Sequence, residues 1–255
     1  MRLGILCQHR SGHTAFEQHL SATHGTALLQ ELDLNLQHAE VEEYLQNLPK
    51  DCILSMMPRE NSGELMEKYN TKKAIVFNTL QMYRHDRMDY LRKLHHSADQ
   101  KNYHIGLKIV RGAYMEKERD RAEEKGYPSP ICIDKKATDD NYNEAINYMM
   151  NHEKMAVFAG THNEESSYLL LELAKQYKID PSDNRLWFGQ LYGMSDHISF
   201  NLAKEGYNTA KYVPFGPVRD VMPYLIRRAE ENTSVAGQTS RELNLIKEER
   251  LRRKL

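Results

Sequence analysis

The sequence predicts an α/β fold whose parallel sheet is built from repeated β/α units. From residue 62 onward, short apolar runs alternate with stretches of helical periodicity. The apolar runs are nearly continuous, as in strands that are covered on both faces. The length of 255 residues suits one α/β barrel, or two smaller domains. Five β/α units are clear, so a closed eight-stranded barrel needs three more strands before residue 62, and an open sheet is the alternative.

The first 61 residues have a weaker pattern. Leu3–Cys7 and Cys52–Met57 are short apolar runs that can form strands. Ala27–Leu36 and Ala39–Leu48 have apolar residues at roughly helical spacing, which predicts two helices. The pattern therefore leaves the structure of residues 1–61 open and places the barrel in residues 62–240, with a basic C-terminal helix or tail at 241–255.

The elements after residue 62 follow from periodicity and from turn residues. Helices are predicted over Ser62–Tyr69, Arg87–Asp99, Glu116–Lys125, Asp139–His152, Glu164–Tyr177 and Asp196–Glu205. Strands are predicted over Lys73–Asn78, His104–Val110, Met155–Ala159, Arg185–Gln190 and Asn208–Val213.

The last predicted strand leads into a turn and a final helix. Pro214, Gly216 and Pro217 mark the turn, and the helix begins near Pro223, since proline is tolerated in a first helical turn. Two adjacent arginines, Arg227 and Arg228, follow. Such a pair is usually a solvated surface feature. The sharper interpretation is a clamp in which two guanidinium groups bind one carboxylate.

Composition excludes several classes of protein. The net charge of −1 gives no reason to expect nucleic acid as a partner. Three widely spaced cysteines argue against a disulfide framework or a zinc site and favour a reducing compartment. No apolar run approaches the ~20 residues of a membrane span, and the apolar start is too short for a signal peptide. We therefore expect a soluble, cytoplasmic protein.

Polar residues gather at the carboxyl ends of the predicted strands, where β/α folds place their active sites. Lys108 is the most informative of them, because it lies in a strand on the face opposite Leu107 and Ile109. A lysine there is either a structural ion pair or snorkelling side chain, or a cation directed at an electron-rich cofactor. Gly112 and Ala113 leave room for a flat ring to approach the backbone.

Other residues are consistent with ordinary structural roles. His162 is a hydrogen-bonding residue or a site residue, and no histidine has the helical spacing of a metal site, so we expect no metal. The sequence contains neither a Gly-x-Gly-x-x-Gly motif nor a P-loop. Ser195 lacks the context of a nucleophile elbow, and we interpret Cys132 as structural.

Taken together, these motifs resemble the flavin-dependent proline dehydrogenase family of the single-function type. The resemblance covers about three quarters of the chain, from roughly Glu64 to the C-terminus. It rests on the segments Lys108–Tyr114 with Glu118-Arg119, Thr161-His162-Asn163, Phe188–Asp196, Tyr212–Arg228 with Glu231-Asn232, Arg241-Glu242-Leu243 and Glu249-Arg250.

The resemblance implies a distorted (βα)8 TIM-like barrel that holds FAD at its strand ends and oxidises L-proline to Δ1-pyrroline-5-carboxylate. It further implies that a membrane quinone accepts the electrons. Arg227 and Arg228 match residues that bind the proline carboxylate, and Tyr212 matches the aromatic residue at the proline ring. The implied substrate and catalytic set is Lys108, Tyr114, Leu191, Tyr212, Arg227 and Arg228. The implied FAD contacts are Gln81, Lys108, Val110, Gly112, Ala113, Thr138, Thr161, His162 and Glu231.

The chain also departs from the family pattern. The family has a lysine motif and an Asp-Ala-Glu-Glu-like motif in its first three strands, and neither occurs before Ser62. The sequence therefore leaves two main alternatives, an active enzyme and a catalytically impaired remnant with an incomplete barrel wall. A third, less favoured alternative is an unrelated barrel enzyme that acts on another carboxylated substrate. The basic tail Leu243–Leu255 is a solvated terminal helix, or else a lid or a peripheral contact with the inner membrane that helps the protein reach quinone.

Overall fold

The computed structural model describes residues 3–8, 28–32, 53–56, 62–213, 218–219, 222–226 and 238–254. The chain forms two compact units, Met1–Val213 and Pro214–Leu255, and each is described by itself. The domain boundaries after residues 61 and 240 that the sequence suggests stay predictions.

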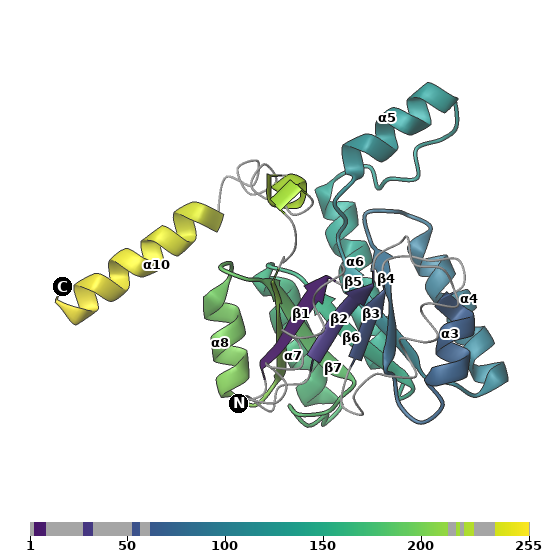
Figure 1. Ribbon diagram of the computed structural model, residues 1–255, viewed down its shortest axis with the longest axis horizontal. Coiled ribbons are helices and arrows are strands. Elements are labelled where there is room, and N and C mark those ends of the chain that lie inside the picture. Colours follow the sequence, from purple (N-terminus) through teal and green to yellow (C-terminus); the bar gives the residue numbers. More distant parts are fainter. Residues whose placement is uncertain are drawn as a thin grey trace. The chain divides into compact units, whose positions relative to one another are not determined.

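Eight parallel strands in the first unit close into a barrel in the order of the sequence (Figure 1). The barrel closes because β1 pairs with β8, with Leu3 opposite Thr209 and Cys7 opposite Val213. The strands are β1 (Leu3–Gln8), β2 (Leu28–Leu32), β3 (Ile53–Met56), β4 (Val76–Gln81), β5 (Ile105–Val110), β6 (Met155–Gly160), β7 (Leu186–Leu191) and β8 (Asn208–Val213).

Closure of the barrel corrects two expectations from the sequence. The barrel is not incomplete and the sheet is not open, because β1, β2 and β3 supply the first three strands. The helix predicted over Ala27–Leu36 is also wrong, since Leu28–Leu32 is a strand that pairs with β1 on one side and β3 on the other. Hydrogen bonding on both edges overrides the helical propensity of leucine and glutamine there. The predicted helix Ala39–Leu48 lies outside the described residues.

The helices of the barrel unit agree with the predicted periodicity to within a few residues at each end. Asp134 and Asn163 begin two of them as side-chain caps, each accepting a hydrogen bond from a backbone N–H three residues later. The helices are α3 (Ser62–Tyr69), α4 (Arg87–Lys101), α5 (Met115–Lys125), α6 (Lys135–Met150), α7 (Glu164–Gln176) and α8 (Asp196–Lys204).

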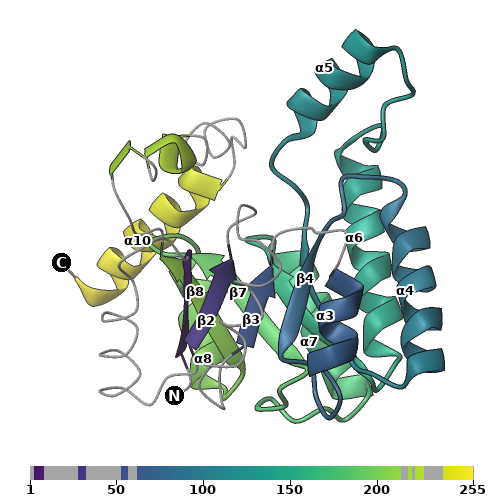
Figure 2. The same ribbon diagram turned by 45° about the vertical axis from the view of Figure 1, so that its right-hand side comes forward.

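One apolar core lies between the strands and the helices outside them. Leu107 and Ile109 of β5 are fully buried there with Tyr142 and Ile146 of α6. Figure 2 shows α4 and α6 side by side outside the barrel. Because strand side chains alternate, Gly106, Lys108 and Val110 face the barrel interior. The face predicted for Lys108 is therefore confirmed.

Aromatic rings fill the lower part of the barrel interior. The rings of Phe158 and Trp187, on β6 and β7, are stacked with centroids 6.5 Å apart and planes inclined by 5°. A Cβ atom at Gly189 would overlap the Phe158 ring, so only glycine fits at that position. This packing fills the interior beside β6 and β7, below the side chains at the carboxyl ends of these two strands.

The second unit contains helical residues 218–219 and 222–226 and helix α10 (Gln238–Arg253). Residues 222–226 agree with the helix expected near Pro223. In α10, Glu249 forms ion pairs with Arg252 and Arg253. Across the part of the chain that the structure describes, no helix is long and apolar enough to cross a membrane.

Candidate active site

The candidate site lies at the carboxyl ends of the barrel strands and in the loops that follow them. Gln81 ends β4 and is the register partner of Val110 on β5. Thr79 pairs in the same way with Lys108. Gln81, Lys108 and Val110 therefore share the interior face of two adjacent strands, as three of the predicted cofactor contacts should.

Lys108 is partly exposed and extends along the interior face toward β6. A Cβ atom placed at Gly160 would lie 2.9 Å from Val110 Cγ1 and 3.8 Å from Lys108 Cε. The glycine at the end of β6 thus leaves space for the side chain of Val110, and the stem of Lys108 lies at ordinary contact distance from the same position. The lysine brings a positive charge to the barrel mouth. Charges interact more strongly there than in bulk water, because the surrounding residues exclude much of the water.

The loop after β4 places an aromatic ring on the loop after β5. Gly112 has a φ of +125°, and a Cβ atom there would overlap the ring of Tyr83. Both the backbone angle and the close approach require glycine. Burial, followed by the charge of Glu118, raises the pKa of Tyr83 to about 12. The flat group that packs on Gly112 is thus a tyrosine of this chain, to which the sequence analysis assigns no role.

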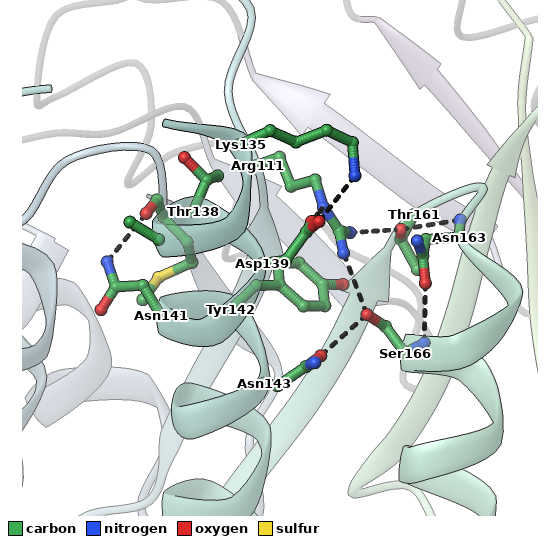
Figure 3. Close-up of polar contacts among 12 residues, drawn as sticks. Arg111, Lys135, Thr138, Asp139, Asn141, Tyr142, Asn143, Thr161, Asn163 and Ser166 are labelled. Carbon is green, nitrogen blue, oxygen red and sulfur yellow. Dashed lines mark hydrogen bonds and ion pairs between the residues drawn. The ribbon is translucent and has the colours of Figure 1, made fainter. Parts of the chain in front are cut away.

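Arg111 connects the ends of β5 and β6 to the starts of α6 and α7 (Figure 3). Its Nε donates to Asp139 Oδ1 at 2.5 Å, its Nη1 to Thr161 Oγ1 at 2.9 Å and its Nη2 to Ser166 Oγ at 3.0 Å. The guanidinium carbon also lies 4.5 Å from the centre of the Tyr142 ring. All three nitrogens therefore have acceptors, and the charge is matched by a carboxylate.

Asp139 receives a second cation from its own helix. Lys135 Nζ lies 2.6 Å from Asp139 Oδ2, one helical turn away. Burial opposes ionisation of Asp139, but the hydrogen bonds and charges of Lys135 and Arg111 prevail and lower its pKa. The group is therefore a carboxylate at neutral pH, which makes it a firm anchor for Arg111.

Thr161 and His162 are held in place where β6 ends. The Thr161 carbonyl accepts a hydrogen bond from Gln190 Nε2 at 3.2 Å, while its hydroxyl accepts from Arg111 and from the Asn163 N–H. His162 Nδ1 lies 2.9 Å from Ser195 Oγ, at the start of α8. These contacts join β6, β7 and α8 at one rim.

The remaining predicted residues occupy three places. Leu191 and Tyr212 are register partners at the ends of β7 and β8. Ala113 and Tyr114 follow β5 and lead into α5, and Thr138 is buried in the first turn of α6. Arg227, Arg228 and Glu231 lie outside the described residues, so their predicted roles stay predictions.

A pocket of about 660 Å³ lies beside the start of α6. It is lined by His85, Arg119, Ser129, Ile131, Cys132, Ile133 and Ala137. Cys132 is buried, and burial raises the pKa of its thiol, which agrees with the structural role expected for it. Within the described ranges, no group of three or more His, Cys, Asp or Glu side chains has the arrangement of a metal site.

The comparisons with known proteins agree on one family. The family model described as proline dehydrogenase matches residues 28–241. The chain is 39% identical over 203 residues to mitochondrial proline dehydrogenase 1 of Drosophila melanogaster, covering 75% of this chain and 30% of that protein. It is 41% identical over 194 residues to the Homo sapiens protein of the same name, covering 74% and 32%.

A solved structure gives the same result. Proline utilization A from Bdellovibrio bacteriovorus matches with a TM-score of 0.65 and 26% identity, over 72% of this chain and 20% of that one. The chain spans about a third of the length of the Drosophila and human relatives. Both relatives are named mitochondrial, which contradicts the cytoplasmic location expected from the composition.

Proposed function

The chain belongs to the proline dehydrogenase family, and from this premise we propose that it binds FAD and oxidises L-proline to Δ1-pyrroline-5-carboxylate. The observation that carries the proposal is the shared interior face of Gln81, Lys108 and Val110 at the carboxyl ends of β4 and β5. Two register-paired residues, Leu191 and Tyr212, end the strands on the other side of the same rim. This is the part of a β/α barrel in which catalysis takes place.

The described residues fit a flavin. Gln81 Oε1 is buried and has no hydrogen-bond partner among the described residues, so it can accept a hydrogen bond from a bound ring. The start of α6 gives no further support for phosphate binding, because Asp134 caps the helix and Lys135 and Lys136 each form an ion pair with a carboxylate one turn later. Gln81, Lys108, Val110, Ala113, Thr138, Thr161 and His162 would hold FAD, and Glu231 of the predicted set lies outside the described residues. Because Tyr83 covers one side of Gly112, that glycine can contribute only its backbone groups.

FAD supplies, when bound, the acceptor for the hydride that leaves proline. The chain's own contribution is binding, orientation and charge. Arg227 and Arg228 bind the substrate carboxylate, while Tyr212, Leu191 and Tyr114 enclose its ring. The Lys108 ammonium stabilises the negative charge that develops at the interior face during the reaction. Holding the substrate in one orientation then provides much of the rate enhancement.

A dye-reduction assay tests this proposal. The purified chain, reconstituted with FAD, is expected to reduce an artificial electron acceptor only when L-proline is present. The double variant Arg227→Met/Arg228→Met is expected to keep its flavin and lose the proline-dependent rate. A chain that takes up FAD but reduces the dye at the same rate without proline would contradict the proposed substrate.

A second candidate is a catalytically impaired member of the same family. It is favoured by one observation, the absence of the lysine motif and the Asp-Ala-Glu-Glu-like motif before Ser62. The closed barrel removes the argument from a missing wall, because β1, β2 and β3 are in place. This candidate predicts that the purified chain fails to retain FAD, which separates it from the active enzyme.

Quinone as the electron acceptor and a peripheral membrane contact complete the proposal. Helix α10 exposes Leu243, Ile246 and Leu251 on the same helix as Arg250, Arg252 and Arg253. Exposed apolar residues interspersed with basic ones suit the surface of an anionic bilayer. Since the relatives are named mitochondrial, we place the chain in the same compartment. Co-sedimentation with anionic vesicles that is lost when 241–255 is removed would support the membrane contact, and equal recovery without vesicles would contradict it.

A further inference from the structure

Lys211 is a buried lysine that the proposed chemistry does not use. It lies in β8 and is 4% exposed, and its neighbour Tyr212 faces the other side of the strand. Its Nζ donates to Met194 O at 2.6 Å, to Asp196 Oδ1 at 2.7 Å and, more weakly, to Leu191 O at 3.4 Å. An ammonium group has three donors, and each of them has an acceptor here.

The acceptors of Lys211 all belong to the connection between β7 and α8. This connection is a tight one, because Gly193 and Ser195 both have left-handed backbone angles, with φ of +74° and +49°. The Tyr192 N–H donates to the Tyr212 carbonyl at 2.9 Å, which ties the start of the connection to β8. Lys211 contacts both its start, at Leu191, and its end, at Asp196.

We propose that Lys211 is a positioning residue that holds the connection after Leu191 against β8, and so fixes the wall that Leu191 forms opposite Tyr212 in the pocket for the substrate ring. The inference rests on the proposed function, which places these two side chains at that ring. Lys211 precedes Tyr212 in β8. It donates to the carbonyl of Leu191, which is the register partner of Tyr212. One side chain therefore couples the two pocket walls without contacting the substrate.

A purely structural ion pair would explain the burial of Lys211 but not this placement. Asp196 is 55% exposed at its side chain, so the pair is only half removed from water, and its contribution to stability is modest. The shortest of the three hydrogen bonds goes to the Met194 carbonyl, whereas the Leu191 carbonyl also accepts from the Met194 N–H at 3.1 Å. Without the ammonium group, the connection loses its contacts with Lys211 at Met194 and Asp196, and the Tyr192–Tyr212 backbone hydrogen bond and the β7–β8 pairing remain to hold Leu191.

The test compares Lys211→Met with Lys204→Met, the same substitution at an exposed lysine at the end of α8. The flavin content of the unaltered chain and the proline-dependent reduction of that flavin are measured first. If either is absent, the result counts against the proposed function rather than against this inference. In flavin-loaded protein, Lys211→Met is expected to raise the KM for proline about tenfold while kcat changes less than about threefold. Lys204→Met is expected to change neither.

Ring-size selectivity provides the second readout. Lys211→Met is expected to lower the preference for proline over its six-membered homologue by about fivefold, since a displaced wall no longer excludes the extra methylene. An unchanged KM and an unchanged preference would overturn the inference. If Lys211→Met does not accumulate as folded protein, Lys211→Gln decides, since its amide is uncharged and has two donors in place of three. A KM raised about threefold or more in that variant supports the inference, and a smaller change overturns it.

Discussion

Arg111 is the residue whose removal should most disturb the rim of the barrel. The change to test is Arg111→Met, because methionine keeps most of the apolar stem and removes the three hydrogen bonds to Asp139, Thr161 and Ser166. Asp139 keeps Lys135 as a partner, so no fully unpaired carboxylate remains. Thr161 keeps its hydrogen bond from the Asn163 N–H, so the loss there is partial.

The magnitude follows from the kind of bond that is lost. Hydrogen bonds to charged groups contribute roughly 1.5–3 kcal/mol each when buried. Arg111 and Asp139 are each 23% exposed at their side chains, which reduces these values, and we expect a total loss of about 3 kcal/mol. For a protein of this size, that loss lowers the melting temperature by roughly 6–12 °C.

Thermal and chemical unfolding of purified protein measure the effect, with Arg92→Met as the matched control. Arg92 also pairs with a carboxylate from α6, Glu144 at 2.6 Å, but the side chains are 48% and 53% exposed. A surface pair of this kind contributes about 0–1 kcal/mol. Equal destabilisation by the two substitutions would refute the argument that the Arg111 contacts hold the rim together.

Three further predictions concern the described residues. Burial, and next the charge of His152, lowers the pKa of His95 below the ordinary histidine value of 6.5, so the unfolded chain binds more protons just below that pH. The free energy of unfolding should therefore fall as the pH drops from about 7.5 to about 5.5, and urea unfolding at the two pH values measures this fall. The fall should be smaller in His95→Gln. The same fall in both proteins would exclude His95 as its source. Gly112→Ala should destabilise the chain by about 2 kcal/mol or more, since alanine at positive φ is strained and its Cβ overlaps Tyr83. The control is Gly126→Ala, because Gly126 also has positive φ but has open space around it. Equal losses of unfolding free energy in the two variants would rule out the Tyr83 contact as a cause. Lys108→Met should slow flavin reduction by proline about 10- to 100-fold in rapid-mixing experiments while KM changes little, and an unchanged rate would remove Lys108 from the charge-stabilising role.

The repeated β/α pattern was predictable from the sequence, and the closure of the barrel was not. The strands from β4 to β8 are short runs rich in apolar and β-branched residues between helical segments, so their type follows from local composition. The segment Leu28–Leu32 reads as helix locally, because its strand conformation depends on pairing with β1 and β3. Local patterns contain no information about such partners.

The same distinction applies to the site. The orientation of Lys108 follows from the two-residue period of a strand. The partners of Arg111 do not, because Thr161 and Ser166 are 50 and 55 residues away in the sequence. Tyr83 was missed for a similar reason, since its ring meets Gly112 only once β4 and β5 are paired. A glycine directly after a polar strand end was the available signal for that contact.

The visible absorption spectrum of the purified, FAD-reconstituted chain, recorded without oxygen before and after L-proline is added, tests the central claim most directly. We predict the bands of oxidised flavin, at about 450 nm, and their loss on addition of L-proline. A spectrum that shows bound flavin but does not change with proline would contradict the proposed substrate. A protein that does not retain FAD at all would contradict the claim that this barrel is an active flavoenzyme.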